Sequence, residues 1–275
     1  MTLDIDKTAK LEQAARRMRR EALDMTYRAK AAGAHIGGTL SMIETMAVLY
    51  LHTMRFRVGE PDWEGRDRFI LSKGHGVMAQ YLAMKEAGML TQADIETFKT
   101  NDTKLYAHPS MGSVPGIEFS SGSLGQGLSL GVGVALALRR KGNTDARVFV
   151  LMGDGECDEG SVWEAAASAA HFGTNHLVAI IDENMLQYDG TTEAVQNKSR
   201  MADRWRAFGW DVVSVDGHDV AQLAQALDKR TEGPLVVIAR TVKGKGVSFM
   251  EGNPLWHNGR LSDNQYQAAL AEVEG

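Results

Sequence analysis

The stretch VFVLMGDGECDEG at residues 148–160 decides the fold, because a continuous apolar run ends there at a turn between two glycines. An apolar run without polar alternation is typical of a strand in a parallel sheet whose two faces are both covered. Asp154 follows directly, between Gly153 and Gly155. Ligands of open α/β sheets bind beyond the carboxyl ends of the strands. The stretch therefore predicts a buried strand with an acid at a binding site.

The last two-thirds of the chain alternate between predicted strands and predicted helices. The strands are expected at 68–72, 147–152, 177–182, 211–215 and 235–241. The helices between and around them are expected at 77–87, 125–140, 159–172, 199–208 and 219–230. This alternation predicts an α/β domain, doubly wound, with a mostly parallel sheet and helices on both faces.

Two further helices are predicted in the amino-terminal third. One covers 8–32, with Thr8 as its cap and Gly33 as its stop. The other covers 41–54, where Ser41 and Glu44 form a possible capping box. Because the chain shows neither an internal repeat nor a linker, we expect a single domain over residues 1–275.

Composition limits the classes of function. The 275 residues with 44% hydrophobic content suffice for one large core. A net charge of -5 gives no reason to expect nucleic acid or an anionic membrane as partner. The most apolar segment, 124–138, is glycine-rich and too short to cross a bilayer. The single cysteine, Cys157, rules out an intrachain disulfide, and the amino terminus lacks a signal-peptide pattern, so we expect a cytoplasmic protein.

Asp154 has a partner at the end of the next predicted strand, where Asn184 stands in IIDENMLQYDG. One helix and one strand separate the two residues, so in a right-handed βαβ unit both side chains reach the same crevice. A carboxylate, an amide oxygen and nearby carbonyls form an oxygen-only site suited to Mg²⁺ or Ca²⁺, with a diphosphate adding oxygens. Gly153 and Gly155 let the backbone approach that diphosphate. The alternative is a structural turn capped by Asp154.

Three histidines stand apart from any apolar periodicity, and a fourth is a further candidate. His35, His75 and His257 each lie beside a glycine or in a glycine-rich turn, and His108 lies in YAHPS. In such turns the backbone and a side chain can both meet a ligand. The remaining histidines are assigned to structure or to the surface, as is usual for isolated histidines: His52, His171, His176 and His218.

Taken together, several segments resemble the diphosphate-binding domain of transketolase, a thiamine diphosphate enzyme. They are GDG with its distant asparagine, AGAHIGGTLSMIETMAVLY (32–50), DRFILSKGHG (67–76), SSGSLGQGLSLGVGVALA (120–137) and TVKGKGVSFME (241–251). They occur in the family's order over nearly the whole chain. The family motif usually ends in two asparagines, and Glu183 replaces the first of them here.

The resemblance implies a role for each matched residue. Asp154, Asn184 and the backbone carbonyl of Leu186 would hold a divalent metal, Mg²⁺ or alternatively Ca²⁺ or Mn²⁺. The following residues would contact thiamine diphosphate: His75, Gly122, Ser123, Leu124, Gly153, Gly155, Asn184 and His257. His35, His108 and His257 would face the substrate hydroxyls or move their protons, which suits imidazole near neutral pH. Glu159 would join a carboxylate network between cofactor sites, although it could also simply favour a helix amino terminus.

The family also needs a glutamate from a second, pyrimidine-binding domain, which activates the aminopyrimidine. The present chain ends before such a domain, so the resemblance implies half of a split transketolase. The expected partner is a separate carboxyl-terminal subunit, in an α2β2 assembly. Gly127, Gly131 and Ala135 recur at helical spacing and could admit a helix of another subunit, or could pack inside the domain.

The implied reaction transfers a two-carbon ketol unit from a ketose to an aldose such as glyceraldehyde 3-phosphate. Three alternatives remain open from the sequence. The chain could be an α subunit of a 2-oxo acid dehydrogenase, or a subunit without catalytic function. It could also be a specialised split transketolase for a branched sugar (apulose 4-phosphate) or a sulfosugar (6-deoxy-6-sulfofructose).

Overall fold

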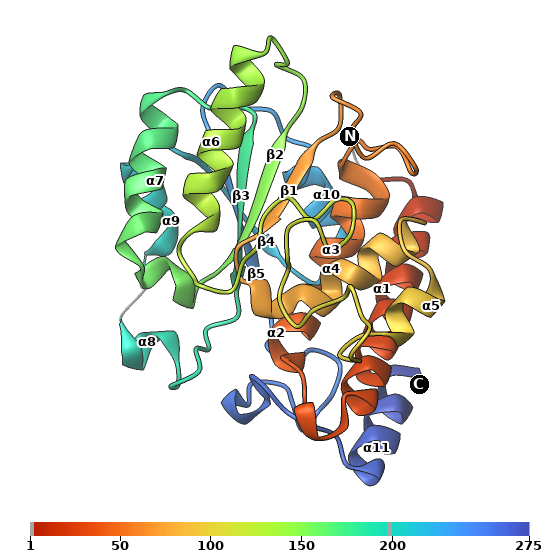
Figure 1. Cartoon of the computed structure of the whole chain (residues 1–275). Helices are drawn as coiled ribbons and strands as arrows, with labels where there is room; N and C mark the ends of the chain where they lie inside the picture. The colour runs from red at the N-terminus through yellow and green to blue at the C-terminus, as the bar shows by residue number, and fades with distance from the viewer. Residues whose placement is uncertain (1–2, 197–199, 275) are drawn as a thin grey trace.

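A five-stranded parallel sheet forms the centre of the domain (Figure 1). The structure is a computed structural model, which describes residues 3–196 and 200–274. The strand order is β1-β2-β3-β5-β4, and all neighbouring strands pair in parallel. The strands are β1 (Arg68–Leu71), β2 (Val148–Gly153), β3 (Leu177–Glu183), β4 (Asp211–Asp216) and β5 (Leu235–Arg240). The predicted α/β fold and all five predicted strands are confirmed.

Helices cover both faces of the sheet (Figure 1). Helices α6, α7 and α9 lie on one face, because the chain moves in one direction from β1 to β4 and right-handed crossovers keep to one side. Helix α10 lies on the other face, since the chain reverses direction between β4 and β5. The helices after β1 are α4 (Val77–Glu86), α5 (Gln92–Glu96), α6 (Gly127–Arg140), α7 (Gly160–His171), α8 (Thr192–Val195), α9 (Met201–Ala207), α10 (Val220–Leu227) and α11 (Asp263–Glu274).

Each face of the sheet has its own apolar core, because side chains alternate between the faces along each strand. Phe149 and Leu151 of β2 pack with the helices of the amino-terminal third. Val148 and Val150 pack against α6 and α7. Burial on both faces explains why the strands appear in the sequence as continuous apolar runs.

The amino-terminal third differs from its prediction in two places. Helix α1 (Ile5–Arg28) begins earlier than expected, because Asp4 rather than Thr8 is its N-cap and accepts a hydrogen bond from the Lys7 amide. The helix expected at 41–54 consists of α3 (Ile43–Val48) and a π-helical turn (Leu49–Thr53), and a separate short helix that was not expected, α2 (Ile36–Leu40), precedes it.

The two residues of the expected capping box, Ser41 and Glu44, make other contacts. The expected capping box was wrong, since Ser41 ends α2 and its hydroxyl donates to Asp182 at 2.7 Å. Glu44 instead pairs with Arg19 and His218. In the carboxyl-terminal half, α9 begins at Met201, and residue 199 of the helix expected at 199–208 lies outside the described residues.

The glycines of α6 pack against the interior of this chain. A Cβ at Gly127 would lie 2.3 Å from the Ser72 side chain, and one at Gly131 would lie 2.5 Å from Val150. Neither position could hold a larger residue without moving the sheet. The spacing of these small residues is therefore explained by packing inside the domain.

The segment after β5 returns across the carboxyl edge of the sheet before α11 packs on α1 (Figure 1). Ala34 and Gly259 join the two ends of the domain through reciprocal backbone hydrogen bonds of 2.8 and 2.9 Å. Among the described helices, none combines the length and the apolar character needed to cross a membrane.

Candidate functional site

A cavity of about 490 Å³ lies at the carboxyl ends of β1, β2 and β3. It contains all but one of the site residues that the sequence predicted. The predicted residues that line it are His35, His75, His108, Gly122, Leu124, Gly153, Asp154, Gly155, Glu159, Asn184, Leu186 and His257. Ser123 is exposed and lies outside this lining, so its predicted contact with the cofactor stays a prediction.

Asp154 begins the turn that follows β2 and is only 2% exposed. Its carboxylate accepts hydrogen bonds from the amides of Gly155 at 2.8 Å and Met185 at 2.7 Å. Burial, followed by the nearby charge of Asp182, raises the pKa of Asp154 to about 6, and these two amides act in the opposite direction. A cation beside this carboxylate would relieve both effects.

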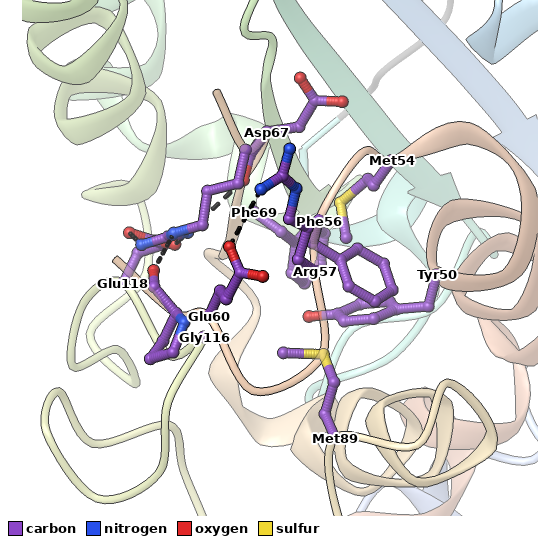
Figure 2. Close-up of a pocket in the computed structure, with 12 residues that line it drawn as sticks. Tyr50, Met54, Phe56, Arg57, Glu60, Asp67, Phe69, Met89, Gly116 and Glu118 are labelled. Atoms are coloured by element: carbon purple, nitrogen blue, oxygen red, sulfur yellow. Dashed lines mark hydrogen bonds and ion pairs between the residues drawn. The ribbon is translucent and has the colours of Figure 1, made fainter. Parts of the chain in front are cut away.

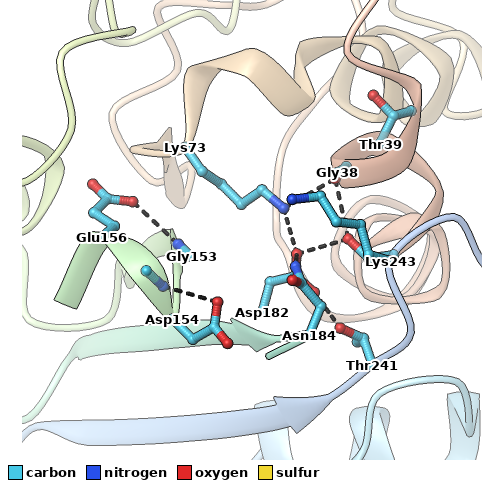
Figure 3. Close-up of polar contacts among 12 residues, drawn as sticks. Gly38, Thr39, Lys73, Gly153, Asp154, Glu156, Asp182, Asn184, Thr241 and Lys243 are labelled. Atoms are coloured by element: carbon cyan, nitrogen blue, oxygen red, sulfur yellow. Dashed lines mark hydrogen bonds and ion pairs between the residues drawn. The ribbon is translucent and has the colours of Figure 1, made fainter. Parts of the chain in front are cut away.

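Asn184 directly follows β3, the neighbour of β2, so the predicted juxtaposition with Asp154 is present (Figure 3). Its amide nitrogen donates to Asp182 at 3.0 Å, and its amide oxygen accepts from the Leu186 backbone at 3.1 Å. This orientation leaves the Asn184 oxygen on the side of Leu186. The amide is thus held in place before any ligand arrives.

The donor set suits a hard divalent cation that shares its shell with a ligand. Within the described parts of the chain, no group of three or more His, Cys, Asp or Glu side chains could hold a metal on its own. Asp154, Asn184 and the Leu186 carbonyl offer three oxygens around one cavity. Hard cations take six or more oxygen ligands, so an anionic ligand such as a diphosphate would complete the shell.

Two buried lysines that the sequence analysis did not single out also point into this region (Figure 3). Lys73, only 1% exposed, forms an ion pair with Asp182 and donates to the Gly38 carbonyl at 2.9 Å. Lys243 donates to the Leu186 carbonyl at 3.1 Å and lies 3.0 Å from His257 Nδ1. Burial, followed by the charge of Lys73, lowers the pKa of Lys243 to about 8. Two cations beside a metal site are what a diphosphate requires.

The four predicted histidines form one cluster in the same cavity, and His257 joins it to the lysines through Lys243 at 3.0 Å. The ring of His35 lies 5.6 Å from that of His75, 5.5 Å from His108 and 5.5 Å from His257. The rings of His75 and His257 are 5.0 Å apart. Backbone pairing of Ala34 with Gly259 brings His35 and His257 together from opposite ends of the sequence.

These histidines are neutral near physiological pH. Burial, followed by the charge of His108, lowers the pKa of His35 to about 4. Burial and the charge of Lys243 lower the pKa of His257 to about 3. Burial also lowers the pKa of His75 and of His108. A neutral imidazole has one donor and one acceptor nitrogen, so the cluster can both donate to and accept from hydroxyl groups.

The glycines of the cavity fall into two kinds. A Cβ at Gly153 would meet no atom of the described residues within 4 Å, so packing does not explain that glycine. At Gly155 a Cβ would lie 2.8 Å from the Gln187 side chain, and at Gly122 it would lie 3.3 Å from the ring of His108. Gly153 is therefore the position where room for a ligand is the best explanation.

Two glutamates follow the GDG turn and differ in surroundings. Glu156 is buried, and it accepts hydrogen bonds from the amides of Gly125 at 2.8 Å and Gly153 at 3.1 Å and from the Ser72 hydroxyl. It ties the ends of β1 and β2 to the start of α6. Glu159 is exposed on the cavity rim and holds the N-cap position of α7 without a side-chain capping bond. Capping therefore does not account for Glu159.

A second cavity lies between aromatic and charged residues on the far side of the domain, lined by Tyr50, Phe56 and Phe69 with Arg66 and Glu118 (Figure 2). Its volume is about 30 Å³. That space holds about one or two water molecules. The cavity at the carboxyl ends of the strands, which gathers the predicted site residues, is the candidate active site.

Comparison with known proteins agrees with this geometry. Residues 11–272 match the family described as "Transketolase, thiamine diphosphate binding domain". The fold and site thus define an α/β thiamine diphosphate-binding domain. More particularly, the chain belongs to the transketolase family of transferases, and the resemblance stated from the sequence is confirmed.

Two curated relatives are subunits of similar length. The chain is 42% identical over 266 residues to a subunit of the apulose-4-phosphate transketolase of Phocaeicola vulgatus, covering 96% of this chain and 93% of that protein. It is 41% identical over 243 residues to a 6-deoxy-6-sulfo-D-fructose transketolase subunit of a Clostridium species, covering 87% and 88%.

A solved structure shows the same fold inside a longer chain. The transketolase of Leishmania mexicana superposes with a TM-score of 0.88 at 30% identity. The match covers 96% of this chain and 41% of that one. The chain thus spans nearly the whole of the two subunit relatives and about two-fifths of this transketolase.

Proposed function

We propose that the protein is the diphosphate-binding subunit of a transketolase that transfers a two-carbon ketol unit from a ketose to an aldose. One observation carries the proposal: a single cavity combines a three-oxygen cation site, two buried lysines and four neutral histidines. The first two features suit a metal-bound diphosphate, and the third suits a polyhydroxylated substrate. Thiamine diphosphate, when bound, supplies the carbanion chemistry that this transfer needs.

At the diphosphate end, Asp154, Asn184 and the Leu186 carbonyl hold Mg²⁺, with Ca²⁺ or Mn²⁺ as alternatives. Lys73 and Lys243 neutralise the remaining charge of the diphosphate, and Gly153 gives it room. His75 and Leu124 contact the cofactor from the other side of the cavity. This division explains why the two lysines are buried without both being paired to acids.

At the substrate end, His35, His108 and His257 bind the hydroxyls of the sugar and move their protons. Their pKa values are lowered, so near neutral pH each ring is neutral and has one accepting nitrogen, which in His257 faces Lys243. Glu159, exposed at the rim, joins the carboxylate network that connects cofactor sites in the assembly.

We propose a separate subunit, carrying the pyrimidine-binding half, as the partner in an α2β2 assembly in the cytosol. Apolar side chains exposed at or near the cavity support this, since exposed apolar groups gathered on one part of the surface favour an interface. They are Leu124, Met185, Tyr188, Val195 and Leu255. Relatives of similar length are named as subunits, which also supports a partner.

For the donor, we propose a sugar phosphate or a related acidic sugar. The two curated relatives act, by name, on apulose 4-phosphate and 6-deoxy-6-sulfofructose, so these are the first donors to assay, with glyceraldehyde 3-phosphate as acceptor. Decarboxylation of a 2-oxo acid by the same preparation would instead favour the 2-oxo acid dehydrogenase alternative.

The proposal is tested by measuring ketol transfer with thiamine diphosphate and Mg²⁺, using the chain with and without the candidate partner. We expect ketol transfer only when the chain and its partner are mixed. Full activity of the isolated chain would contradict the need for a partner. A mixture that binds thiamine diphosphate but transfers no ketol unit from any sugar would contradict the transferase role, and would favour a subunit without catalytic function.

A further inference from the structure

A network of buried polar side chains forms hydrogen bonds to the turn that carries Lys243. This post-β5 turn comprises residues 242–246 and joins β5 to the segment that crosses the cavity. Lys243 points from it toward Leu186 and His257. The neighbouring residues of the turn contact a different set of side chains, all of them outside the cavity lining.

His218 makes the first of these contacts. It lies between β4 and α10, and its Nε2 accepts a hydrogen bond from the Val242 amide at 2.9 Å. A ring nitrogen that accepts carries no proton, so Nδ1 is the donor, and it lies 3.0 Å from Glu44 Oε2. His218 thus connects a backbone amide of the turn to a buried carboxylate.

Glu44 and Arg19 complete the network from the helices. Glu44 and Arg19 are both 7% exposed, and Arg19 Nη2 donates to Glu44 Oε1 at 2.6 Å. Arg19 Nε donates to the Lys245 carbonyl at 2.9 Å, which fixes the other end of the post-β5 turn. Burial alone would raise the pKa of Glu44, but the hydrogen bond from His218 and the charge of Arg19 outweigh burial and lower it.

Glycines allow the turn to lie this close to the network. Gly246 has a φ of 91°, and a Cβ there would be 2.6 Å from Arg19 Cδ. On the other side, the Gly244 amide donates to the Gly37 carbonyl at 3.0 Å, which joins the turn to α2. The backbone on both sides of Lys243 is therefore fixed by contacts that no ligand makes.

We propose that Arg19, Glu44 and His218 are positioning residues, which hold the post-β5 turn so that Lys243 reaches the diphosphate end of the cavity. The inference rests on the proposed function, because it assigns the diphosphate to that end. It adds three residues outside the cavity to those that determine cofactor affinity. Partners that orient a ligand-binding group typically change affinity by about 10–100-fold when removed.

The variants His218→Leu and His218→Gln separate positioning from a purely structural role. Leucine removes both hydrogen bonds, whereas the glutamine amide offers one acceptor and one donor, as the neutral imidazole does. His52→Leu is the matched control, because His52 also pairs with a carboxylate, Asp228 at 2.8 Å, away from the cavity. Titration calorimetry of the full chain, alone and with its partner, uses thiamine diphosphate with Mg²⁺.

We expect His218→Leu to bind thiamine diphosphate at least about tenfold more weakly, with His218→Gln recovering most of the affinity and His52→Leu unchanged. If His218→Leu and wild type bound thiamine diphosphate with equal affinity, this inference would be overturned and the proposed function would stand. A wild-type protein that binds no thiamine diphosphate in either form would overturn the proposed function instead.

Hydrogen exchange provides a readout that needs no cofactor. The Val242 amide should exchange faster in His218→Leu than in wild type and regain its protection in His218→Gln. Protection of residues 242–246 that is the same in wild type and His218→Leu would show that the network does not hold the turn, and would overturn the inference whatever the cofactor does.

Discussion

The two ends of the cavity differ in the charge of the side chains that line them. The diphosphate end contains charges: Asp154, Asp182, Lys73 and Lys243 are each buried and each held by a hydrogen bond or ion pair. The substrate end contains neutral rings that touch one another and have lowered pKa values. The diphosphate end is preorganised to bind a fixed charge. The substrate end offers neutral imidazoles to the hydroxyl groups of a substrate. Mutations at the first should therefore affect folding and binding, and mutations at the second should affect turnover.

The largest expected effect is on stability at the charged end. Lys73→Met leaves the Asp182 carboxylate, 2% exposed, without its ion-pair partner. Removing one member of a buried pair costs about 3–5 kcal/mol, so urea unfolding should show a loss of that size. The double variant Lys73→Met with Asp182→Asn should recover part of it. A Lys73→Met protein as stable as wild type would mean that the pair is not a buried charge pair.

The next effect is on cofactor binding at the same end. Asp154→Ala removes the carboxylate of the cation site, and we expect metal-dependent binding of thiamine diphosphate to weaken more than about 100-fold, or about 2.7 kcal/mol. Calorimetry on the assembled complex measures this. Asp189→Ala, which changes a carboxylate on the cavity lining away from the cation site, is the control. Unchanged binding by Asp154→Ala would place the metal elsewhere.

At the substrate end we expect an effect on turnover, with stability and cofactor binding little changed. His35→Phe removes a hydrogen-bonding ring while keeping an aromatic group among the other histidines. We expect kcat/KM for the ketose donor to fall by at least about 100-fold, as for a lost proton-transfer group, while the affinity for thiamine diphosphate stays within about twofold. A parallel loss of cofactor affinity would remove the distinction between the two ends.

The smallest effect is a change in how stability depends on pH. The pKa of His35 is about 4 in the folded chain, below its ordinary value of about 6.5, so the unfolded state binds the proton first. The free energy of unfolding should therefore fall as pH decreases from about 6.5 toward 4. His35→Gln should reduce this slope, and His171→Gln, at an exposed position of α7, is the control. Urea unfolding at several pH values measures the slopes, and equal slopes for both variants would contradict the assignment.

The sequence predicted the parts of the site that are local. Apolar runs located all five strands, and the positions of Asp154 and Asn184 at strand ends placed them together, because parallel strands share one carboxyl edge. Glycine neighbours singled out His35, His75 and His257, and the resemblance to the family added His108. Each of these signals lies within a few residues of the feature it predicts.

The missed residues depend on contacts distant in sequence. Lys73 and Lys243 carry no local sign of burial, since a lysine is usually exposed and its acid partner Asp182 lies on another strand. His218 was assigned to structure or surface, and Glu44 to a helix cap, because nothing near either residue indicates that they pair. Folding brings the members of such a buried polar network together from distant parts of the sequence, so no local pattern predicts it.

The backbone pair of Ala34 and Gly259 has a consequence for biosynthesis. These residues stand almost the whole length of the chain apart, yet their pairing brings His35 beside His257. The ribosome makes the amino-terminal residues first, so the substrate end of the cavity cannot close until residue 259 has left the exit tunnel. Such non-local closure is slow compared with helix formation. The substrate end of the cavity therefore forms only after nearly the whole chain has been made.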